Sequence, residues 1–263
     1  MRRLFKSVFN KTRRLILKGM PATRVGKNAK GDITKYFDKH TENLIISELK
    51  RNIKFKAQII SEELKKPFLI NPSAKTRMRY IIIDPVDGSD NYLAGTHFVA
   101  VAIAVFDAEL KPVYSFAGNY YTGDCVYADA KALYFNDRKI RKPFIRPPKE
   151  LLLLAVTDIT AKRPAEFMSL VREFDIIRSF GATVGELLYV VKGEAKAFVD
   201  IRGKLTLENF APFFLVARHA GIIMTDEKGR DIKLSSLSLT KEYKLVFSQP
   251  AFLKKILKHT GCI

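Results

Sequence analysis

The chain is poor in several residue types that would point to particular classes of protein. It has no tryptophan and only two cysteines, Cys125 and Cys262. Two cysteines form neither a disulfide framework nor a metal-ligand cluster, which fits a reducing compartment, and we expect a cytoplasmic protein. The four histidines are scattered singly, without the spacing of metal ligands. No apolar run reaches the roughly eighteen residues that a membrane-spanning helix needs. Disulfides, cysteine–histidine metal clusters and membrane spans are therefore not expected.

Acidic residues are absent from the first 31 residues, which hold ten Lys or Arg, and the net charge is +19. Such a charge suits nucleic acid, an anionic membrane surface or small anionic substrates. Basic residues in this stretch face away from apolar side chains at helical spacing. The apolar face comprises Leu4, Phe5, Val8, Phe9, Thr12, Leu15 and Ile16. We expect this helix to pack on the domain, with a membrane surface or nucleic acid as the alternative. The scarcity of glutamine indicates a heat-adapted source.

The first half of the chain is expected to lay helices on an antiparallel sheet. At 263 residues and 47% hydrophobic content, the chain is long enough for a large core and has a globular composition. Its patterns predict helices and strands in turn. They are a helix over 38–51, strands over 57–61, 79–84 and 97–106, a basic loop over 66–79, and alternating strands over 111–140.

The order of predicted elements changes after the proline-containing segment "RKPFIRPP" (141–148), which marks a boundary in the chain. Strands "LLLLAVT", "DIIRSF", "KAFVDI" and "GIIMT" alternate with helices near 161–174, from about 183, and from about 207 to 219. This alternation indicates a layered α/β part. We therefore divide the chain into an N-terminal α+β half, residues 1–145, and a C-terminal α/β half, residues 146–263.

Two pairs of carboxylates stand at the ends of predicted strands. Glu62 and Glu63 follow one strand, while Asp84 and Asp87 lie in "IIIDPVDGSDNYLAG" (81–95). Hard divalent cations such as Mg²⁺ prefer oxygen ligands, and two of them can hold both the attacking and the leaving oxygen of a phosphoryl transfer. Asp84, on a stiff strand, is suited to bridge two ions. The pattern indicates a metal site.

The residues after Asp84 support the same interpretation. Pro85 fixes the backbone so that the carbonyl of Val86 turns back toward the same place as Asp87. Gly88 and Ser89 then offer N–H groups to a phosphate. The alternative is an acidic turn without function, because Asp-Pro-x-Asp-Gly suits a turn by itself.

Taken together, "SEE", "DPVDGSDN" and "RHAGIIMTD" resemble the inositol monophosphatase family of Mg²⁺-dependent, Li⁺-sensitive sugar-phosphate phosphatases. The similarity is greatest to archaeal members, which dephosphorylate fructose-1,6-bisphosphate and inositol phosphates. The segments "DITKYFDKHTE", "GNYYTGDCVYAD", "RSFGAT" and "FVDIR" occur in the expected order from about Gly31 onward. The resemblance implies an α/β fold, the layered α-β-α-β-α sandwich of the sugar phosphatases.

The resemblance also implies roles at matching positions. Two or three Mg²⁺ ions, or Mn²⁺, would be bound by Glu62, Asp84, the carbonyl of Val86, Asp87 and Asn209. Asp38 and Ser89 would form the pair that activates the attacking water, and Glu63 would sit just behind the metal ligands and polarise a metal-bound water. The phosphate and the rest of the substrate would be bound by Gly88, Ser89, Arg178, Gly181, Ala182, Thr183, Asp200 and Arg202. Of these, the two arginines would hold a second phosphate.

Asn209 departs from the family pattern, in which an Asp at this position ligates the second metal. Its amide oxygen can still serve as a ligand, but it carries no negative charge. Glu208 lies about 100° further around a helix and substitutes only if the local register shifts. A structural alternative for Asn209 is the capping of a helix end.

We therefore expect a phosphatase acting on inositol-1-phosphate or fructose-1,6-bisphosphate, with a small phosphorylated anion as its partner molecule. The alternatives are a catalytically impaired member that binds an anion or partner, a phosphatase of nucleotide 3′,5′-bisphosphates, and a nucleic-acid-binding protein. No nucleic-acid-binding motif supports the last of these. A homodimer is implied by the resemblance alone.

Overall fold

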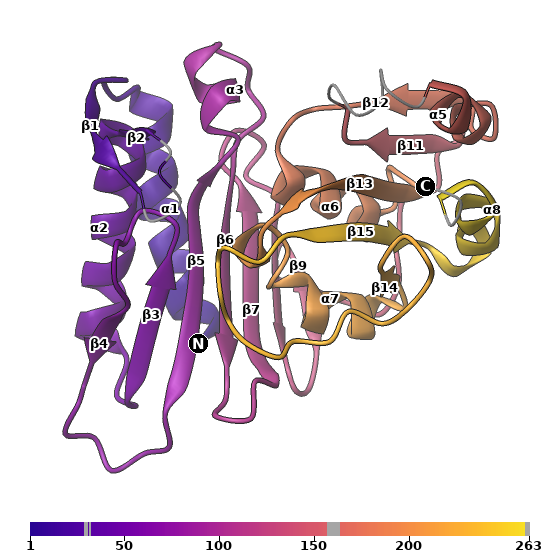
Figure 1. The fold of residues 1–263 in the computed structure, drawn as a ribbon. Helices are drawn as coiled ribbons and strands as arrows, with labels where there is room; N and C mark the ends of the chain where they lie inside the picture. Colours follow the sequence, from indigo (N-terminus) through magenta and orange to yellow (C-terminus); the bar gives the residue numbers. More distant parts are fainter. Residues whose placement is uncertain (29–30, 32, 157–163, 261–263) are drawn as a thin grey trace.

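The fold is a sandwich of alternating helical and sheet layers. The computed structural model describes residues 1–28, 31, 33–156 and 164–260. A pair of long helices covers one face of an eight-stranded sheet, a second set of helices separates that sheet from a five-stranded sheet, and two further helices lie outside the second sheet (Figure 1). Three separate hydrophobic clusters fill the spaces between these layers. The expected α-β-α-β-α sandwich is therefore confirmed.

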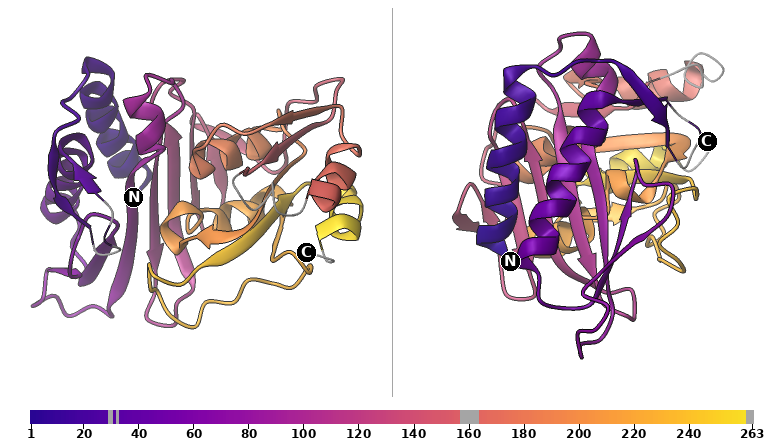
Figure 2. Two further views of the ribbon diagram at one scale, coloured as in Figure 1. Left: turned by 45° about the horizontal axis from the view of Figure 1, so that its top comes forward. Right: turned by 90° about the vertical axis from the view of Figure 1, so that its left-hand side faces the viewer.

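The first helical layer contains α1 (Arg2–Lys18) and α2 (Tyr36–Asn52), which lie side by side (Figure 2). The apolar face of α1 is buried through Phe5, Val8, Phe9 and Ile16. This confirms that the basic N-terminal helix packs on the domain. A short hairpin, β1 (Arg24–Lys27) and β2 (Ile33–Lys35), connects the two helices and was not predicted. In the described part of the chain, no helix is long and apolar enough to cross a membrane.

The eight-stranded sheet is antiparallel except for one pair, β3 and β5. Its strands, in order, are β10 (Arg138–Ile140), β9 (Leu133–Phe135), β8 (Cys125–Asp129), β7 (Pro112–Asn119), β6 (Ala100–Phe106), β5 (Arg79–Asp87), β3 (Ala57–Ser61) and β4 (Phe68–Ile70). The predicted strands are present, and β6 is buried along its whole length. The prediction of a loop over 66–79 is wrong in part, because three residues there form the edge strand β4.

The parallel pair brings the two acidic segments together. Ser61 at the end of β3 lies opposite Ile83, so that the residues after β3 reach the level of Asp84. The ladder between β5 and β6 is interrupted between Asp84 and Asp87. Pro85 stands in this gap and has no N–H group to donate. Its carbonyl oxygen instead accepts a hydrogen bond from the hydroxyl of Tyr120 at 2.8 Å.

The middle layer holds α6 (Thr183–Lys192), a 3₁₀ turn (Leu207–Asn209) and α7 (Phe213–Ala220). These elements bury the largest hydrophobic cluster between the two sheets. The helix predicted from about 183 is confirmed. The helix predicted over 207–219 is broken, because Pro212 lacks the N–H group that a continuous helix would require at that position.

The second sheet follows the order β12 (Ile176–Arg178), β11 (Leu151–Leu154), β13 (Ala197–Leu205), β15 (Tyr243–Ser248) and β14 (Ile223–Thr225). Its outer face packs on α5 (Pro164–Val171) and α8 (Pro250–Thr260). The four strands predicted in this half are confirmed, whereas β15 and α8 were not predicted. The helix expected near 161–174 is present from Pro164 to Val171, and residues 157–163 lie outside the described residues.

Candidate active site

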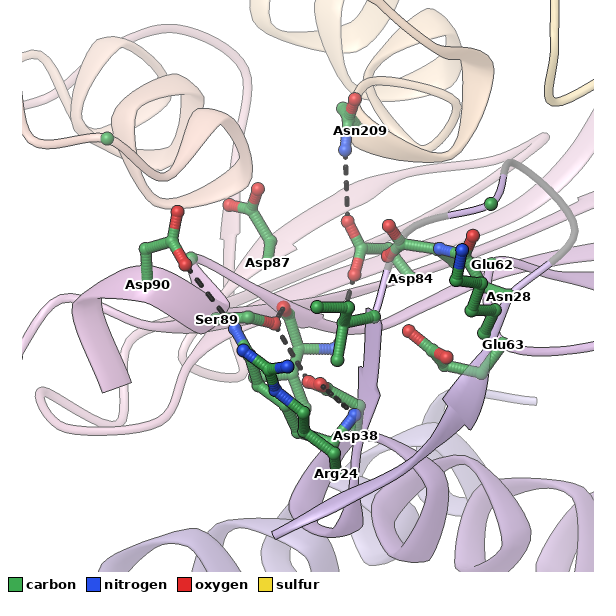
Figure 3. Close-up of a pocket in the computed structure, with 17 residues that line it drawn as sticks. Arg24, Asn28, Asp38, Glu62, Glu63, Asp84, Asp87, Ser89, Asp90 and Asn209 are labelled. Atoms are coloured by element: carbon green, nitrogen blue, oxygen red, sulfur yellow. Dashed lines mark hydrogen bonds and ion pairs between the residues drawn. The ribbon is translucent and has the colours of Figure 1, made fainter. Parts of the chain in front are cut away.

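A cavity of about 750 Å³ opens where the ends of β3 and β5 meet α2, the β1–β2 hairpin and the 3₁₀ turn (Figure 3). It is lined by six carboxylates and three cations. The carboxylates are Asp38, Glu62, Glu63, Asp84, Asp87 and Asp90, and the cations are Arg24, Lys27 and Lys35. The structure therefore brings both predicted acid pairs into one space.

Asp84 lines this cavity and is only 1% exposed. One carboxylate oxygen accepts the backbone N–H of Val86 at 3.2 Å. The other accepts a hydrogen bond from the side-chain amide nitrogen of Asn209 at 3.1 Å (Figure 3). Both oxygens of the predicted bridging ligand are thus engaged by N–H donors.

Asp87 is contributed by the end of β5 and contacts the beginning of α6. The backbone N–H of Val184 donates to Oδ2 of Asp87 at 2.7 Å. Burial raises the pKa of Asp87 to about 7, against the lowering effect of the N–H groups of Val184, Gly185 and Thr183. The contact ties the first sheet to the middle helices. It also satisfies an N–H group in the first turn of α6, which has no partner within the helix.

Asp38 and Ser89 form a hydrogen-bonded pair across the cavity. Asp38 lies in the first turn of α2, where it accepts the backbone N–H of Lys35. The hydroxyl of Ser89 lies 2.8 Å from Oδ1 of Asp38 and 3.0 Å from the carbonyl oxygen of Val86. Burial raises the pKa of Asp38 to about 7, although the Ser89 hydrogen bond acts to lower it. The carboxyl group is therefore poised to exchange a proton near neutral pH.

Glu62 and Glu63 enter the cavity from the end of β3. The backbone N–H of Glu62 donates to the carbonyl of Ile83 at 3.4 Å, which holds this segment against β5. The carboxylate of Glu63 accepts a hydrogen bond from the hydroxyl of Thr34 on β2. Lys39 donates to the carbonyl of Glu63 at 3.1 Å. The hairpin and α2 thus both position Glu63.

The donor set fits a hard divalent cation in its chemistry, because carboxylates and a backbone carbonyl are the oxygen ligands that Mg²⁺ prefers. The side-chain positions are less favourable. Among the described residues, no three His, Cys, Asp or Glu side chains are arranged to hold an ion. Asp84 and Asp87 face N–H donors, on Asn209 and Val184 respectively. Ion binding requires these oxygens to leave or share those donors.

The turn after β5 depends on a glycine. Gly88 has φ of +88°, and a Cβ atom added there would lie 2.8 Å from the Cβ of Ala182 and 3.0 Å from the carbonyl of Phe98. Only glycine fits both the left-handed backbone and the close approach. Ser89 begins the short helix α3 (Ser89–Leu93), and both residues line the cavity beside the carboxylates.

Asn209, and not Glu208, faces the cavity. Its side-chain oxygen accepts the backbone N–H of Thr206 at 3.2 Å, so Asn209 caps the 3₁₀ turn. This is the helix-capping role given above as the alternative to metal binding. Glu208 is fully buried, and its Oε1 accepts the hydroxyl of Thr206 at 2.7 Å. The register shift that would bring Glu208 into the cavity does not occur.

A smaller cavity of about 170 Å³ adjoins the first, since Asp87, Gly181 and Asn209 line both. Its other lining residues include Thr183 and Arg202, both predicted. Asp200 does not line either cavity, although it was predicted to contact substrate. It is fully buried, and Arg202 donates to its two oxygens at 2.9 and 2.5 Å.

The remaining predicted substrate residues lie outside the two cavities. Arg178 is exposed on β12 and donates to the carbonyl of Ile177 at 2.7 Å. Ala182 is buried behind Gly88. The structure thus gathers the metal, catalytic and phosphate candidates around one cavity, but it separates Arg178 from them.

Several lining residues were not predicted. Arg24, Lys27 and Lys35 come from the hairpin, and Lys204 and Glu186 line the smaller cavity. The acid-free first 31 residues were a signal for Arg24 and Lys27, but not for Lys35, and the sequence does not show which of its basic residues return to the site. Glu186 stands in the apolar segment "TVGELLYVV", and an acid on the buried face of a helix was the signal for it.

Comparisons with known proteins find related sequences and a related fold. The model of the inositol monophosphatase family matches residues 4–261. A fructose-1,6-bisphosphatase/inositol-1-monophosphatase of Thermococcus kodakarensis is 32% identical over 235 residues, covering 89% of this chain and 85% of the relative. A protein of the same description from Methanocaldococcus jannaschii is 31% identical and covers 80% and 77%. The crystal structure of an inositol monophosphatase–fructose 1,6-bisphosphatase superposes with a TM-score of 0.82 at 26% identity, covering 98% of both chains.

Proposed function

The chain belongs to the inositol monophosphatase family, and on that premise we propose that it hydrolyses inositol-1-phosphate, fructose-1,6-bisphosphate or both in the cavity beside Asp84. It is a phosphoric monoester hydrolase of the sugar and inositol phosphate class. The observation that carries the proposal is the convergence of two acid pairs from parallel strand ends with the Asp38–Ser89 pair in one cavity.

Mg²⁺ is the proposed cofactor, since the family is one of metal-dependent phosphatases and the oxygen donors suit a hard cation. Glu62, Asp84, Asp87 and the carbonyl of Val86 would hold it. When bound, a divalent ion supplies a lowered water pKa and stabilises the charge on the phosphoryl oxygens. The chain itself supplies orientation and proton transfer.

The proposed proton acceptor is the Asp38–Ser89 pair. A water beside Ser89 loses a proton to the serine oxygen, while the serine hydroxyl proton passes to Oδ1 of Asp38, 2.8 Å away. The water oxygen forms its bond to phosphorus, the ester P–O bond breaks, and the leaving oxygen takes a proton from solvent water to depart as the alcohol. Asp38 is suited to this role because a general base works best when its pKa lies near the pH of the reaction, and the pKa of Asp38 is raised to about 7. Glu63 would help to polarise the attacking water.

The phosphate would be held by the amides of Gly88 and Ser89 at the cavity wall. The rest of the substrate would extend into the smaller cavity, past Gly181 and Thr183. Arg202 lines that cavity with its guanidinium held by Asp200, which supports a role in binding a second phosphate. Asp200 is therefore proposed as a positioning residue.

A second candidate function follows from Asn209, whose amide nitrogen contacts Asp84 where a carboxylate was expected. A cavity with a weakened ligand set favours a protein that binds a phosphorylated anion with little turnover. A nucleotide 3′,5′-bisphosphate would suit the same two cavities.

We also propose that the chain divides into two halves at about residue 145, forms a homodimer and is cytosolic. The division rests on the sequence pattern, the homodimer on the family, and the location on the presence of only two cysteines.

The test is phosphate release by the purified protein with and without Mg²⁺. The panel holds inositol-1-phosphate, fructose-1,6-bisphosphate and adenosine 3′,5′-bisphosphate. We expect Mg²⁺-dependent turnover that disappears in Asp87→Asn and falls roughly 10²–10⁴-fold in Asp38→Asn and Ser89→Ala. The matched control is Glu109→Gln, which removes an exposed carboxylate. Tight binding of the panel without release would favour the second candidate, and neither binding nor release would refute both.

A further inference from the structure

The helices α1 and α2 form the outermost layer on one side of the molecule, and all the acidic side chains of this layer are buried (Figure 2). Helix α1 has no acid, and in α2 Asp38, Glu42 and Glu48 are 3%, 0% and 4% exposed. Glu42 pairs with Lys39 at 2.6 Å, and Glu48 pairs with Lys11 at 2.7 Å. Along these two helices, which the structure describes throughout, every exposed charge is therefore positive.

A hollow of about 380 Å³ on the polar side of α1 gathers several of these charges. Hydroxyl and amide groups beside cations are the side chains with which proteins commonly contact nucleic-acid phosphates. The described lining belongs to α1 alone and holds four cations, one hydroxyl and one amide, without a carboxylate: Arg3, Lys6, Ser7, Asn10, Lys11 and Arg14. A second hollow, of about 530 Å³, shares three of these residues and continues to α2. The polar side of α1 thus has the chemistry of a surface for phosphate groups.

Three exposed cations of α1 are not neutralised within the protein. Arg3, Arg14 and Lys18 form no ion pair with any residue that the structure describes. From Arg3 to Lys18 the helix rises roughly 22 Å. A duplex carries one phosphate about every 3.4 Å along each strand, so this row of cations extends over about six phosphates. Such a row matches a linear polyanion better than a single small anion.

The apolar side of α1 is already covered by the protein. Phe5, Val8 and Phe9 are buried in the hydrophobic cluster beneath the helix. Among the large apolar side chains of α1, a helix described throughout, only Leu17 is exposed. A helix that binds a lipid surface buries its apolar face among the acyl chains, and α1 has no such face left. The exposed cations therefore favour a polar partner over a membrane.

We propose that the polar side of α1 and the adjoining hollow toward α2 bind the phosphate backbone of double-stranded DNA without sequence preference. Single strands are held by bases stacked on aromatic side chains, and the described lining of the hollow has none. RNA is distinguished from DNA by its 2′-hydroxyl, which donates as well as accepts, and this lining has no carboxylate to accept from it. The proposal is independent of the phosphatase activity, whose cavity lies at the ends of β3 and β5.

The experiment titrates a fluorescent DNA duplex of about 20 base pairs with the purified full chain, in EDTA, and measures anisotropy between about 50 and about 200 mM KCl. The test variant carries Arg3→Gln and Arg14→Gln, which remove two cations from the hollow. The matched control carries Arg172→Gln and Arg218→Gln, which remove two exposed arginines from the region of α5 and α7. Both variants keep the cations of the acidic cavity. Circular dichroism establishes that each is folded, and an RNA duplex and anionic lipid vesicles are tested in parallel.

We expect the wild type and the control to bind the DNA duplex with a dissociation constant of about 10⁻⁴–10⁻⁶ M at physiological salt. The logarithm of the affinity should fall with the logarithm of salt concentration with a slope of about −3.6, because each of the four cations in the hollow contributes about −0.9. The test variant should have a slope of about −1.8 and bind about tenfold more weakly or worse.

Three results would overturn the proposal: no DNA binding by the wild type, an unchanged slope and affinity in the test variant, or an equal loss in the control. Tighter binding of the RNA duplex or of the vesicles than of DNA would also overturn it, because the surface would then serve a different partner.

Discussion

Glu186 carries a buried carboxyl group on α6. Its replacement by glutamine is expected to make the unfolding free energy less dependent on pH. The side chain is 2% exposed, and its Oε1 accepts the backbone N–H of Phe180 at 2.8 Å. Burial raises its pKa from 4.5 to about 8, helped by the charges of Asp87 and Asp200. Glutamine retains an oxygen for the Phe180 N–H but has no proton to lose.

The sign and size of this pH effect follow from the pKa of Glu186 in the unfolded chain and in the folded protein. Between pH 4.5 and 8 the folded protein holds a proton on Glu186 that the unfolded chain has released. The stability that this proton contributes is complete below about 4.5 and is lost as the pH rises through 8. One pKa unit corresponds to about 1.4 kcal/mol, so raising the pH from 6 to 8 should cost roughly 2 to 3 kcal/mol. For a chain of this size that is on the order of 5–10 °C in Tm.

The assay is urea denaturation in EDTA at half-unit steps between pH 5.5 and 8.5, with thermal melting in parallel. The quantity compared is the change in unfolding free energy with pH, because Asp38 and Asp87 titrate in the same range in both proteins. Glu109→Gln, an exposed carboxylate removed, should keep the wild-type slope. A Glu186→Gln protein whose stability falls with pH as steeply as the wild type would refute the reasoning.

Three further predictions address other parts of the molecule. Gly88→Ala places a methyl group 2.8 Å from a neighbouring side chain at a φ of +88° and should cost about 2–4 kcal/mol, whereas Gly26→Ala, with open space around it, should cost under about 1. Phe9→Ala on the buried face of α1 should cost about 3–5 kcal/mol, and Leu17→Ala, 44% exposed, about 0.5 or less. Urea denaturation measures both pairs. Arg202→Gln should raise KM for fructose-1,6-bisphosphate about tenfold or more, because this substrate would place its second phosphate in the smaller cavity. KM for inositol-1-phosphate, which has no second phosphate, should stay within about threefold. Equal changes for both substrates would contradict that role.

Much of the fold could be read from contiguous residues. The apolar face of α1, the uniformly buried strand β6 and the turn at Gly88 each depend on spacing within a short segment. The edge strand β4 and the C-terminal elements β15 and α8 could not, because short or mixed patterns acquire their structure from a neighbour. Three residues of β4, for example, become a strand only by pairing with β3.

The candidate site divides in the same way. The sequence by itself determined which residue types stand at the strand ends, since Glu62 directly follows β3 and Asp84 and Asp87 lie in the last residues of β5. It also showed that an asparagine replaces an expected carboxylate at 209. What it left open was which atom of that residue faces the ligands and whether Glu208 would take its place.

Tertiary structure alone decided those contacts. Ser89 meets Asp38 across 51 positions, Val184 meets Asp87 across 97, and Asn209 meets Asp84 across 125. Each contact joins elements from different layers, and its geometry depends on how the layers pack. The orientation of the Asn209 amide follows from having an N–H donor on one side and a carboxylate on the other. A local pattern cannot encode that choice, because the two partners belong to separate parts of the chain.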